Sequence, residues 1–303
     1  MTGEKEKTYA GHRSGFVAIV GAPNVGKSTL LNRLLDQKIS ITSQKPQTTR
    51  NRILGVLHRK GAQIVFLDTP GVHRSSKPLN VRIVEAAVSV LQDVDMALIL
   101  VDLSRSDPAS EELLVQKLRA SRKPVILGLN KADRVDNDRV LAAIESWSTA
   151  YPFDAVIPIS ALNGYQLPDL VDAMEQRLPV GPPFFPEDAV TDVSERFLAG
   201  EIVREKVFRQ TGQEIPYATA VTVESFEEAS SGKFVRIRAT IHVEKDTQKG
   251  IIIGKKGAKL KRIGEDARKE LERMLGAKVY LELFVRVQKN WTRDTRALRR
   301  FGY

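Results

Sequence analysis

Two short stretches rich in glycine and lysine, one near the start of the chain and one toward its end, have the composition of phosphate-binding loops. The first, GAPNVGKST at residues 21–29, fits the pattern G-x-x-x-x-G-K-[ST]. In such a loop the glycines turn backbone N–H groups toward phosphate oxygens, the lysine adds positive charge, and the serine hydroxyl binds Mg²⁺. An apolar strand pattern precedes it and a helical pattern follows it, as this motif requires. We therefore expect a nucleotide site formed by Gly21, Ala22, Pro23, Asn24, Val25, Gly26, Lys27, Ser28 and Thr29.

Three further motifs each follow an apolar run, so they fall where strands end. DTPG at residues 68–71 places Asp68 to hold Mg²⁺ and the Gly71 N–H to meet a γ-phosphate. In NKAD, residues 130–133, the Asp133 carboxylate would accept from N1–H and the 2-amino group of guanine, a donor pair that adenine lacks. SAL, residues 160–162, offers backbone N–H to guanine O6. The carboxyl ends of parallel strands meet at one sheet edge. We therefore expect GTP or GDP to lie among Asp68, Thr69, Pro70, Gly71, Asn130, Lys131, Asp133, Ser160, Ala161 and Leu162.

These motifs, in this order, resemble those of the translation-factor-related branch of the P-loop GTPases. The resemblance implies Mg²⁺-dependent hydrolysis of GTP to GDP and phosphate, with catalytic roles for Lys27, Thr49, Asp68 and Gly71. It also implies a threonine that closes over the Mg²⁺ held by Ser28 and Asp68. Thr48 and Thr49 both stand in the stretch QKPQTTRNR, and the spacing in the family favours Thr49.

Two positions near the phosphates leave alternatives open. Val72 stands where Ras-like enzymes have a glutamine that orients the attacking water. Valine has no hydrogen-bonding group, so we expect slow intrinsic hydrolysis unless another group positions the water; Val72 could also simply pack the loop. Asn24 matches GTPases of this branch that place K⁺ beside the phosphates, or it stabilises the loop turn alone.

The second glycine-lysine stretch, GKKGAKLKRIG from residue 254, lacks the nucleotide pattern but fits G-x-x-G. An apolar IIIG lead-in precedes it, and a helix is predicted from about Ala258. This is the KH arrangement, in which a tight loop approaches the backbone of about four unpaired nucleotides and lysines attract phosphate. We expect the isoleucines to line the groove for the bases. The predicted RNA-binding residues are Ile253, Gly254, Lys255, Lys256, Gly257, Lys259, Lys261 and Arg262.

The elements that must position these loops change in type along the chain. Up to about residue 180, apolar runs alternate with helical patterns, which indicates an α/β domain with a mostly parallel sheet, helices on both faces and an antiparallel edge strand at 52–58. Beyond it, the order helix, strand, strand, loop, helix, strand predicts a smaller α+β domain of type II KH topology. The predicted ranges are a disordered N-terminus at 1–14, a GTP-binding domain at 15–180, a proline-rich linker at 181–190, and an RNA-binding domain with a basic tail at 191–303.

Composition narrows the class of protein further. The chain has no cysteine, which excludes disulfides and thiolate metal sites, and no apolar run reaches the ~18 residues of a membrane span. Net charge is +10, of which residues 1–190 carry +2 and residues 191–303 carry +8. A basic domain is the usual footprint of a polyanion. The basic aromatic tail, from Trp291 to the end, could extend that contact or dock on the domain.

Taken together, the two halves resemble the Era family of bacterial GTPases, which carry a C-terminal KH domain. KPQTTRNRI, ERFLAGEIVREKVF and IIIGKKGAKLKRIG carry the resemblance from residue 16 to the end. It implies a cytoplasmic monomer that binds single-stranded RNA at the 3′ tail of the small-subunit (16S) rRNA and acts in small ribosomal subunit maturation. It also implies partial association with the inner face of the cell membrane.

Three functions remain open at this point. In the first, GTP and Mg²⁺ order the loops around Thr49 and Gly71, so that RNA affinity depends on the nucleotide. In the second, the chain is a constitutive RNA-binding module whose GTPase domain is structural or regulates through a different partner. In the third, the basic block binds a lipid surface; against this, the lysines cluster on a glycine loop rather than along one face of an amphipathic helix.

Overall fold

The computed structural model divides into two compact units. Their ranges are Met1–Asp36 with Arg52–Asp192, and Gln37–Asn51 with Val193–Tyr303. The structure describes residues 11–22, 24–42, 53–68, 93–105, 115–116, 118–119, 123–212, 215–216, 218–229, 232–294, 296–297 and 301. The predicted disordered residues 1–10 lie outside this set. Each unit is described by itself below.

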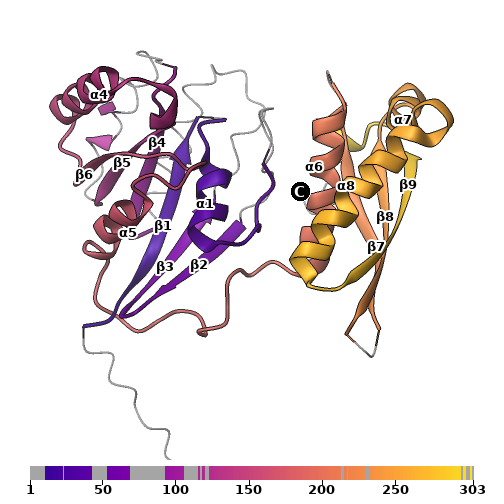
Figure 1. The fold of residues 1–303 in the computed structure, drawn as a ribbon, viewed down its shortest axis with the longest axis horizontal. Coiled ribbons are helices and arrows are strands. Elements are labelled where there is room, and N and C mark those ends of the chain that lie inside the picture. Colours follow the sequence, from indigo (N-terminus) through magenta and orange to yellow (C-terminus); the bar gives the residue numbers. More distant parts are fainter. Residues whose placement is uncertain are drawn as a thin grey trace, which may run out of the picture. The chain divides into compact units, whose positions relative to one another are not determined.

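The first unit contains a six-stranded sheet with the order β2-β3-β1-β4-β5-β6 (Figure 1). β2 is antiparallel to β3, and the other neighbours are parallel. Every residue of β3 and β5 is buried, as expected of strands covered on both faces. The strands are β1 (Arg13–Gly21), β2 (Ile53–Arg59), β3 (Ala62–Asp68), β4 (Met96–Asp102), β5 (Val125–Asn130) and β6 (Ala155–Pro158). The predicted mostly parallel sheet and its antiparallel edge are confirmed.

The helices described in this unit are α1 (Lys27–Leu35), α4 (Asn137–Ala150) and α5 (Leu167–Glu175), with the short 3₁₀ turn η1 (Ala132–Arg134). In Figure 1, α1 and α5 lie in front of the sheet. Asp136 caps the start of α4, since its side chain accepts from the Arg139 N–H. The helix buries Trp147 in a core with Ala18 and Leu127.

Both ends of the predicted first domain differ from expectation. Arg13 and Ser14 belong to β1 rather than to a disordered tail, because the Ser14 N–H donates to the Pro179 carbonyl at 3.1 Å. The proline-rich segment is held on this unit rather than running as a free linker. The Gln63 side chain accepts from the N–H of Phe184 at 2.7 Å, and the Val56 N–H donates to Val190 at 2.8 Å. Residues 181–192 therefore cover the β2–β3 edge.

The second unit packs its helices on one face of a three-stranded sheet with the order β7-β8-β9. β7 and β8 are antiparallel, and β8 and β9 are parallel. Its core joins alternate β8 residues such as Ile237 and Ile241 to Val203, Ile263 and Leu271 from the helices. The elements are α6 (Glu195–Gln210), β7 (Ala220–Glu228), β8 (Phe234–Val243), α7 (Asp246–Ile253), α8 (Ala258–Leu275), β9 (Lys278–Val287) and the 3₁₀ turns η2 (Lys255–Gly257) and η3 (Trp291–Arg293).

The predicted smaller α+β domain is confirmed, with one correction. Residues 246–253 form the helix α7, whereas the sequence suggested an apolar lead-in to a loop. The Gln248 side chain starts this helix by accepting from the N–H groups of Glu244 and Lys245, at 2.9 and 3.1 Å. Ile252 of this helix is fully buried in the core. Gly250 and three β-branched isoleucines give low helix propensity, so packing rather than propensity decides this element.

The C-terminal tail docks on the sheet of this unit. Trp291 is 1% exposed and donates its indole N–H to the Ala218 carbonyl at 3.2 Å. Phe301 packs edge-to-face on Trp291 and also against His242. The sequence left open whether the tail extends the RNA contact or docks on the domain, and these aromatic residues dock.

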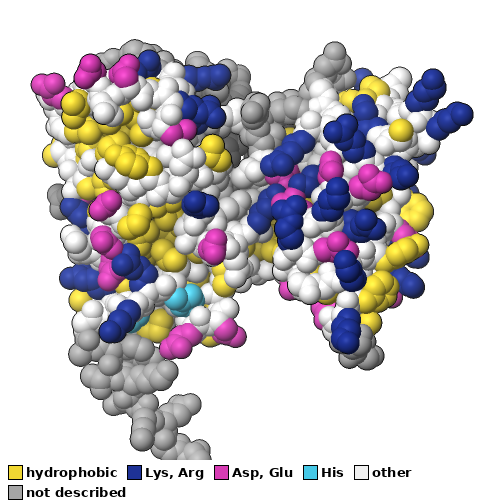
Figure 2. All heavy atoms as spheres, in the orientation of Figure 1, with side chains coloured by type: hydrophobic (Ala, Val, Ile, Leu, Met, Phe, Trp, Pro, Cys, Tyr) yellow, Lys and Arg dark blue, Asp and Glu magenta, His cyan; other side chains and the backbone are white. Residues whose placement is uncertain are grey.

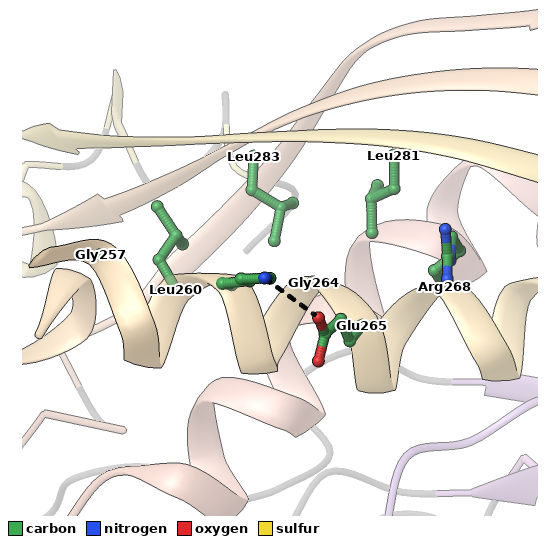
Figure 3. A pocket seen from close by; sticks show the side chains of 8 residues that line it. Gly257, Leu260, Gly264, Glu265, Arg268, Leu281 and Leu283 are labelled. Carbon is green, nitrogen blue, oxygen red and sulfur yellow. Dashed lines mark ion pairs between the residues drawn. The ribbon is translucent and has the colours of Figure 1, made fainter.

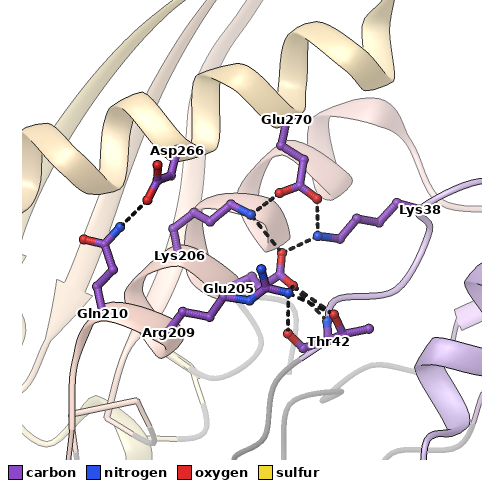
Figure 4. A network of polar contacts seen from close by, with 8 residues as sticks. All are labelled: Lys38, Thr42, Glu205, Lys206, Arg209, Gln210, Asp266 and Glu270. Carbon is purple, nitrogen blue, oxygen red and sulfur yellow. Dashed lines mark hydrogen bonds and ion pairs between the residues drawn. The ribbon is translucent and has the colours of Figure 1, made fainter. Parts of the chain in front are cut away.

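Residues 37–42 follow α1 directly and belong to the second unit, although the sequence ranges placed them in the first domain. Figure 4 shows how charge holds them there: Lys38 pairs with Glu205 of α6 and Glu270 of α8, and Lys206 pairs with the same two carboxylates. Arg209 also pairs with Glu205, at 2.7 Å, and the Thr42 hydroxyl donates to it at 3.1 Å. The Glu205 side chain is 0% exposed. We call these six residues the ionic cluster.

The ionic cluster predicts a specific loss of stability in acid. Burial raises the pKa of Glu270, but hydrogen bonds and charges from Lys206 and Lys38 lower it more, so the net pKa lies below its ordinary value of 4.5. A carboxylate with a depressed folded-state pKa stabilises the protein above its unfolded pKa, and this contribution is lost as pH falls through the folded value. Urea unfolding in steps below about pH 5 should therefore show a shallower pH dependence for Glu270→Gln than for wild type. Equal slopes would contradict this role for Glu270.

None of the helices that the structure describes is long and apolar enough to cross a membrane.

Candidate functional site

The phosphate loop connects β1 to α1, as its motif predicted. β1 ends at Gly21 and α1 begins at Lys27, so the first helical N–H groups point toward the loop. The Lys27 ammonium donates to the carbonyls of Gly21 and Ala22, at 2.8 and 3.0 Å. Burial lowers the pKa of Lys27, and the negative charge of Asp68 partly offsets this. Phosphate oxygens arriving in the loop would favour the charged lysine and take over its hydrogen bonds.

A pair of oxygen ligands lies at the start of α1. The Ser28 hydroxyl donates to an Asp68 carboxylate oxygen at 3.1 Å, and Asp68 is fully buried at the end of β3. Hard oxygen donors of this kind suit Mg²⁺, which binds through one or two protein ligands plus substrate phosphates. The residues thus fit the ion. When bound it would neutralise charge on the outer phosphates.

Asn130 ties the phosphate loop to the base-binding loop. Its side-chain NH₂ donates to the Val25 carbonyl at 2.6 Å, and its oxygen accepts from the Ala161 N–H at 2.9 Å. Asn130 is 2% exposed. Its side chain therefore positions two loops at once, a role beyond the contact with the base predicted from sequence. Of the backbone N–H groups at residues 160–162 that were expected to offer a contact to guanine O6, the Ala161 N–H donates to Asn130.

The base-binding loop exposes the Asp133 carboxylate to solvent and, through Lys131, binds the Asp102 carboxylate. Asp133 lies on η1 directly after β5, with its side chain exposed, and its contact with guanine stays a prediction. Beside it, Lys131 pairs with Asp102 at the end of β4. Burial raises the pKa of Asp102, but hydrogen bonds from Lys131 and Ser104 outweigh it and the net pKa is lowered. Sequence reasoning missed Asp102, although an aspartate closing the run MALILVD was a signal for it.

The structure brings most of the predicted nucleotide residues to one sheet edge. Asp68 ends β3 and Asn130 ends β5, two parallel strands of the same sheet, and the Ala161 N–H of the 160–162 loop donates to Asn130. Leu162 is 63% exposed. The predicted residues Pro23, Thr48, Thr49, Thr69, Pro70, Gly71 and Val72 lie outside the described residues.

A groove lies beside the second glycine loop. It has a volume of about 430 Å³, between α8 and β9. Figure 3 shows Leu281 and Leu283 pointing from the strand toward the helix. Lys261 and Glu265, both exposed residues of the groove lining, form an ion pair at 4.0 Å. The lining residues are Gly257, Leu260, Lys261, Gly264, Glu265, Arg268, Leu281 and Leu283.

The lining differs from the sequence prediction at the isoleucines. Ile252 is in the core and Ile251 is 45% exposed, so the groove takes its apolar wall from leucines of α8 and β9 instead. Among the predicted RNA-binding residues, Gly257 and Lys261 do line the groove. The missed residues of α8 follow Gly257 at helical spacing, which was the available signal.

The glycine loop itself has the geometry that close approach of a backbone needs. Gly254 has φ +71°, and a Cβ there would lie 2.8 Å from Cβ of Lys259. Lys255 and Lys256 are exposed on the loop. Figure 2 shows further Lys and Arg side chains over α8. Positive charge and an apolar groove thus adjoin one another, which fits unpaired nucleotides.

Comparisons with known proteins identify both domains. A family model described as 50S ribosome-binding GTPase matches residues 16–131, and a KH domain model matches residues 214–292. GTPase Era of Geobacter metallireducens is 54% identical over 291 residues, which cover 96% of this chain and 98% of that protein. This chain belongs to the Era family.

Solved structures of Era agree over nearly the whole chain. A variant of Aquifex aeolicus Era bound to GDP·AlF₄⁻ has a TM-score of 0.87 and 43% identity, covering 96% of this chain and 99% of its own. An Era complex with MgGDPNP and nucleotides 1506–1542 of 16S ribosomal RNA matches with the same values. As a member of the Era family, this chain is a GTPase with a C-terminal KH domain.

Proposed function

We propose that this protein is a GTP-controlled switch that binds the 3′ region of small-subunit rRNA through the groove of its KH domain and acts in small-subunit assembly. One observation carries the proposal: a single chain combines a complete phosphate loop with a groove that adjoins an exposed GKKG loop. The Era complex that contains a 16S rRNA fragment supports the choice of RNA.

The test is RNA affinity in two nucleotide states. A fluorescent single-stranded RNA ending in the small-subunit tail sequence is titrated with protein in GDP or in a non-hydrolysable GTP analogue with Mg²⁺, at one stated salt concentration. We expect the affinities to differ between about fivefold and a hundredfold, the usual range of coupling between two sites. Equal affinities would favour the constitutive RNA-binding module and reject the switch.

Two variants make the titration specific for the groove. Gly254→Asp adds a carboxylate where phosphate approaches and places a Cβ against Lys259, so it should lose RNA binding in both nucleotide states. Gly212→Asp adds the same charge at an exposed position with nothing within 4 Å of its Cβ, and it should bind RNA as wild type does. Equal binding by the two variants would reject the groove as the RNA site.

We propose that Asp133 makes the nucleotide site specific for guanine over adenine. Its exposed carboxylate accepts two hydrogen bonds from guanine, and an amide cannot accept both. Asp133→Asn should therefore weaken GTP binding by about a hundredfold, since each lost hydrogen bond to a charged group is worth ~1.5–3 kcal/mol. Xanthosine triphosphate, which offers a carbonyl in place of the 2-amino group, should bind this variant better than GTP. Undiminished GTP affinity, measured by competition, would remove Asp133 from the base site.

Five properties stay predictions: K⁺ beside Asn24, slow intrinsic hydrolysis, a monomeric state, a cytoplasmic location and association with the membrane surface. Acidic liposomes added to the RNA titration would test the membrane alternative, because a lipid that used the same basic surface would displace the RNA.

A further inference from the structure

The strand that walls the groove has a second set of side chains on its opposite face. β9 alternates, so that Leu281 and Leu283 point into the groove while Tyr280, Glu282 and Phe284 point to the other side of the sheet. β9 is an edge strand of the three-stranded sheet. The groove and this opposite face are therefore separated by the width of one strand.

The opposite face carries exposed aromatic rings. Tyr280 is 52% exposed, Phe284 is 50% exposed, and Phe234 on β8 is 36% exposed. The helices pack on the other side of the sheet, and the described residues of the docked tail pack at the end of this face near His242. Exposed rings on a sheet are the usual platform on which unpaired bases stack.

Cations alternate with these rings. Across the three strands the same face holds Arg236, Arg238, Lys278 and Arg286 against the acids Glu224, Glu227 and Glu282. Arg236 lies over the Tyr280 ring, with its guanidinium carbon 5.7 Å from the ring centroid, and Arg238 pairs with Glu282 at 3.0 Å. Positive charge beside flat rings favours a nucleic acid as the partner of this face.

We propose that the open face of this sheet, centred on Tyr280 and Phe284, is a second binding surface for single-stranded RNA, which takes the unpaired nucleotides adjacent to those in the groove. The proposal rests on RNA binding by the groove. A KH groove holds about four nucleotides, so a longer strand must continue past its end. An RNA strand that passes around the edge of the sheet at β9 meets Phe284 and Tyr280 directly, and its phosphates then face Arg286 and Arg236.

The test compares two RNA lengths. Wild type and the double variant Tyr280→Ala with Phe284→Ala are titrated with a four-nucleotide RNA that fills the groove alone and with a single-stranded RNA about three times longer, both in the GTP-analogue state. Base stacking on an aromatic ring contributes ~1–3 kcal/mol, so the double variant should bind the longer RNA about fivefold to a hundredfold more weakly. Its affinity for the short RNA should stay within about twofold of wild type.

Matched variants separate stacking from folding. Tyr280→Phe with Phe284→Trp keeps both rings and should retain full affinity for the longer RNA. Both rings are half exposed, so circular dichroism should show the double alanine variant folded. Undiminished binding of the longer RNA would overturn the proposal and leave the face to a protein partner. An equal loss for both RNA lengths would also overturn it, because the rings would then act through the groove. Failure of wild type to bind the short RNA would instead reject the groove itself.

Discussion

Gly26→Ala is expected to weaken binding of GTP and GDP by about a hundredfold or more. Gly26 has φ +111°, and a Cβ at this position would lie 2.3 Å from the side-chain nitrogen of Asn130. The backbone strain costs ~1–2 kcal/mol, and each buried hydrogen bond that Asn130 would lose costs ~1–3 kcal/mol. Those bonds hold the Val25 carbonyl and the Ala161 N–H, so the phosphate loop and the base loop would be displaced together.

Gly61→Ala is the matched control for this variant. Gly61 also has positive φ, +93°, but nothing lies within 4 Å of the Cβ that alanine would add. It should lose ~1 kcal/mol of stability from strain and keep its nucleotide affinity. Titration with a fluorescent GDP analogue measures both variants. Affinity of Gly26→Ala within about threefold of wild type would show that the loop tolerates the Cβ and that Asn130 does not organise it.

Glu205→Ala is expected to reduce the free energy of unfolding of the second unit by ~3–5 kcal/mol, the usual cost of removing one partner from a buried ion pair. The Glu205 side chain is fully buried and receives hydrogen bonds or charge from Lys38, Lys206, Arg209 and Thr42. Alanine would leave these cations without their central carboxylate. Residues 37–42 would lose their main attachment to α6.

The measurement needs a signal from the second unit alone. The chain has two tryptophans, and Trp147→Phe leaves Trp291, which is buried in the second unit. Urea unfolding followed by its fluorescence then reports the stability of that unit. Glu265→Ala removes a carboxylate from an exposed pair with Lys261, 4.0 Å apart, and should change stability by less than ~0.5 kcal/mol. Similar midpoints for Glu205→Ala and Glu265→Ala would contradict a central role for the ionic cluster.

Patterns local in sequence predicted most of the fold. Continuous apolar runs such as QIVFLD became buried strands because both faces of a parallel sheet are covered, and the motif residues followed because they end those strands. The alternation of apolar and polar residues in FVRIRATIHV predicted β8, and this pattern too is local in sequence. The phosphate loop, Ser28 and Asp68 could therefore be predicted from the amino-acid sequence alone.

Features that depend on distant partners were not predicted. Nothing near Lys38 in the sequence indicates that it pairs with Glu205 and Glu270, so its segment was placed in the wrong unit. α7 was missed because its stability comes from burying Ile252 rather than from helix propensity. The leucines of the groove were missed because Leu281 and Leu283 join Leu260 only when β9 packs beside α8.

The placement of residues 37–42 has a consequence for synthesis of the chain. Lys38 and Glu270 are 232 residues apart, so at ~5–20 residues per second the ribosome makes the second residue about 10–50 s after the first. Throughout that interval the nascent chain carries the lysine while its acidic partners do not yet exist. The first unit can be translated in full before α6 appears, whereas the KH unit needs both an early and a late piece of the polypeptide. The second unit can therefore complete its assembly only after Glu270 has been translated.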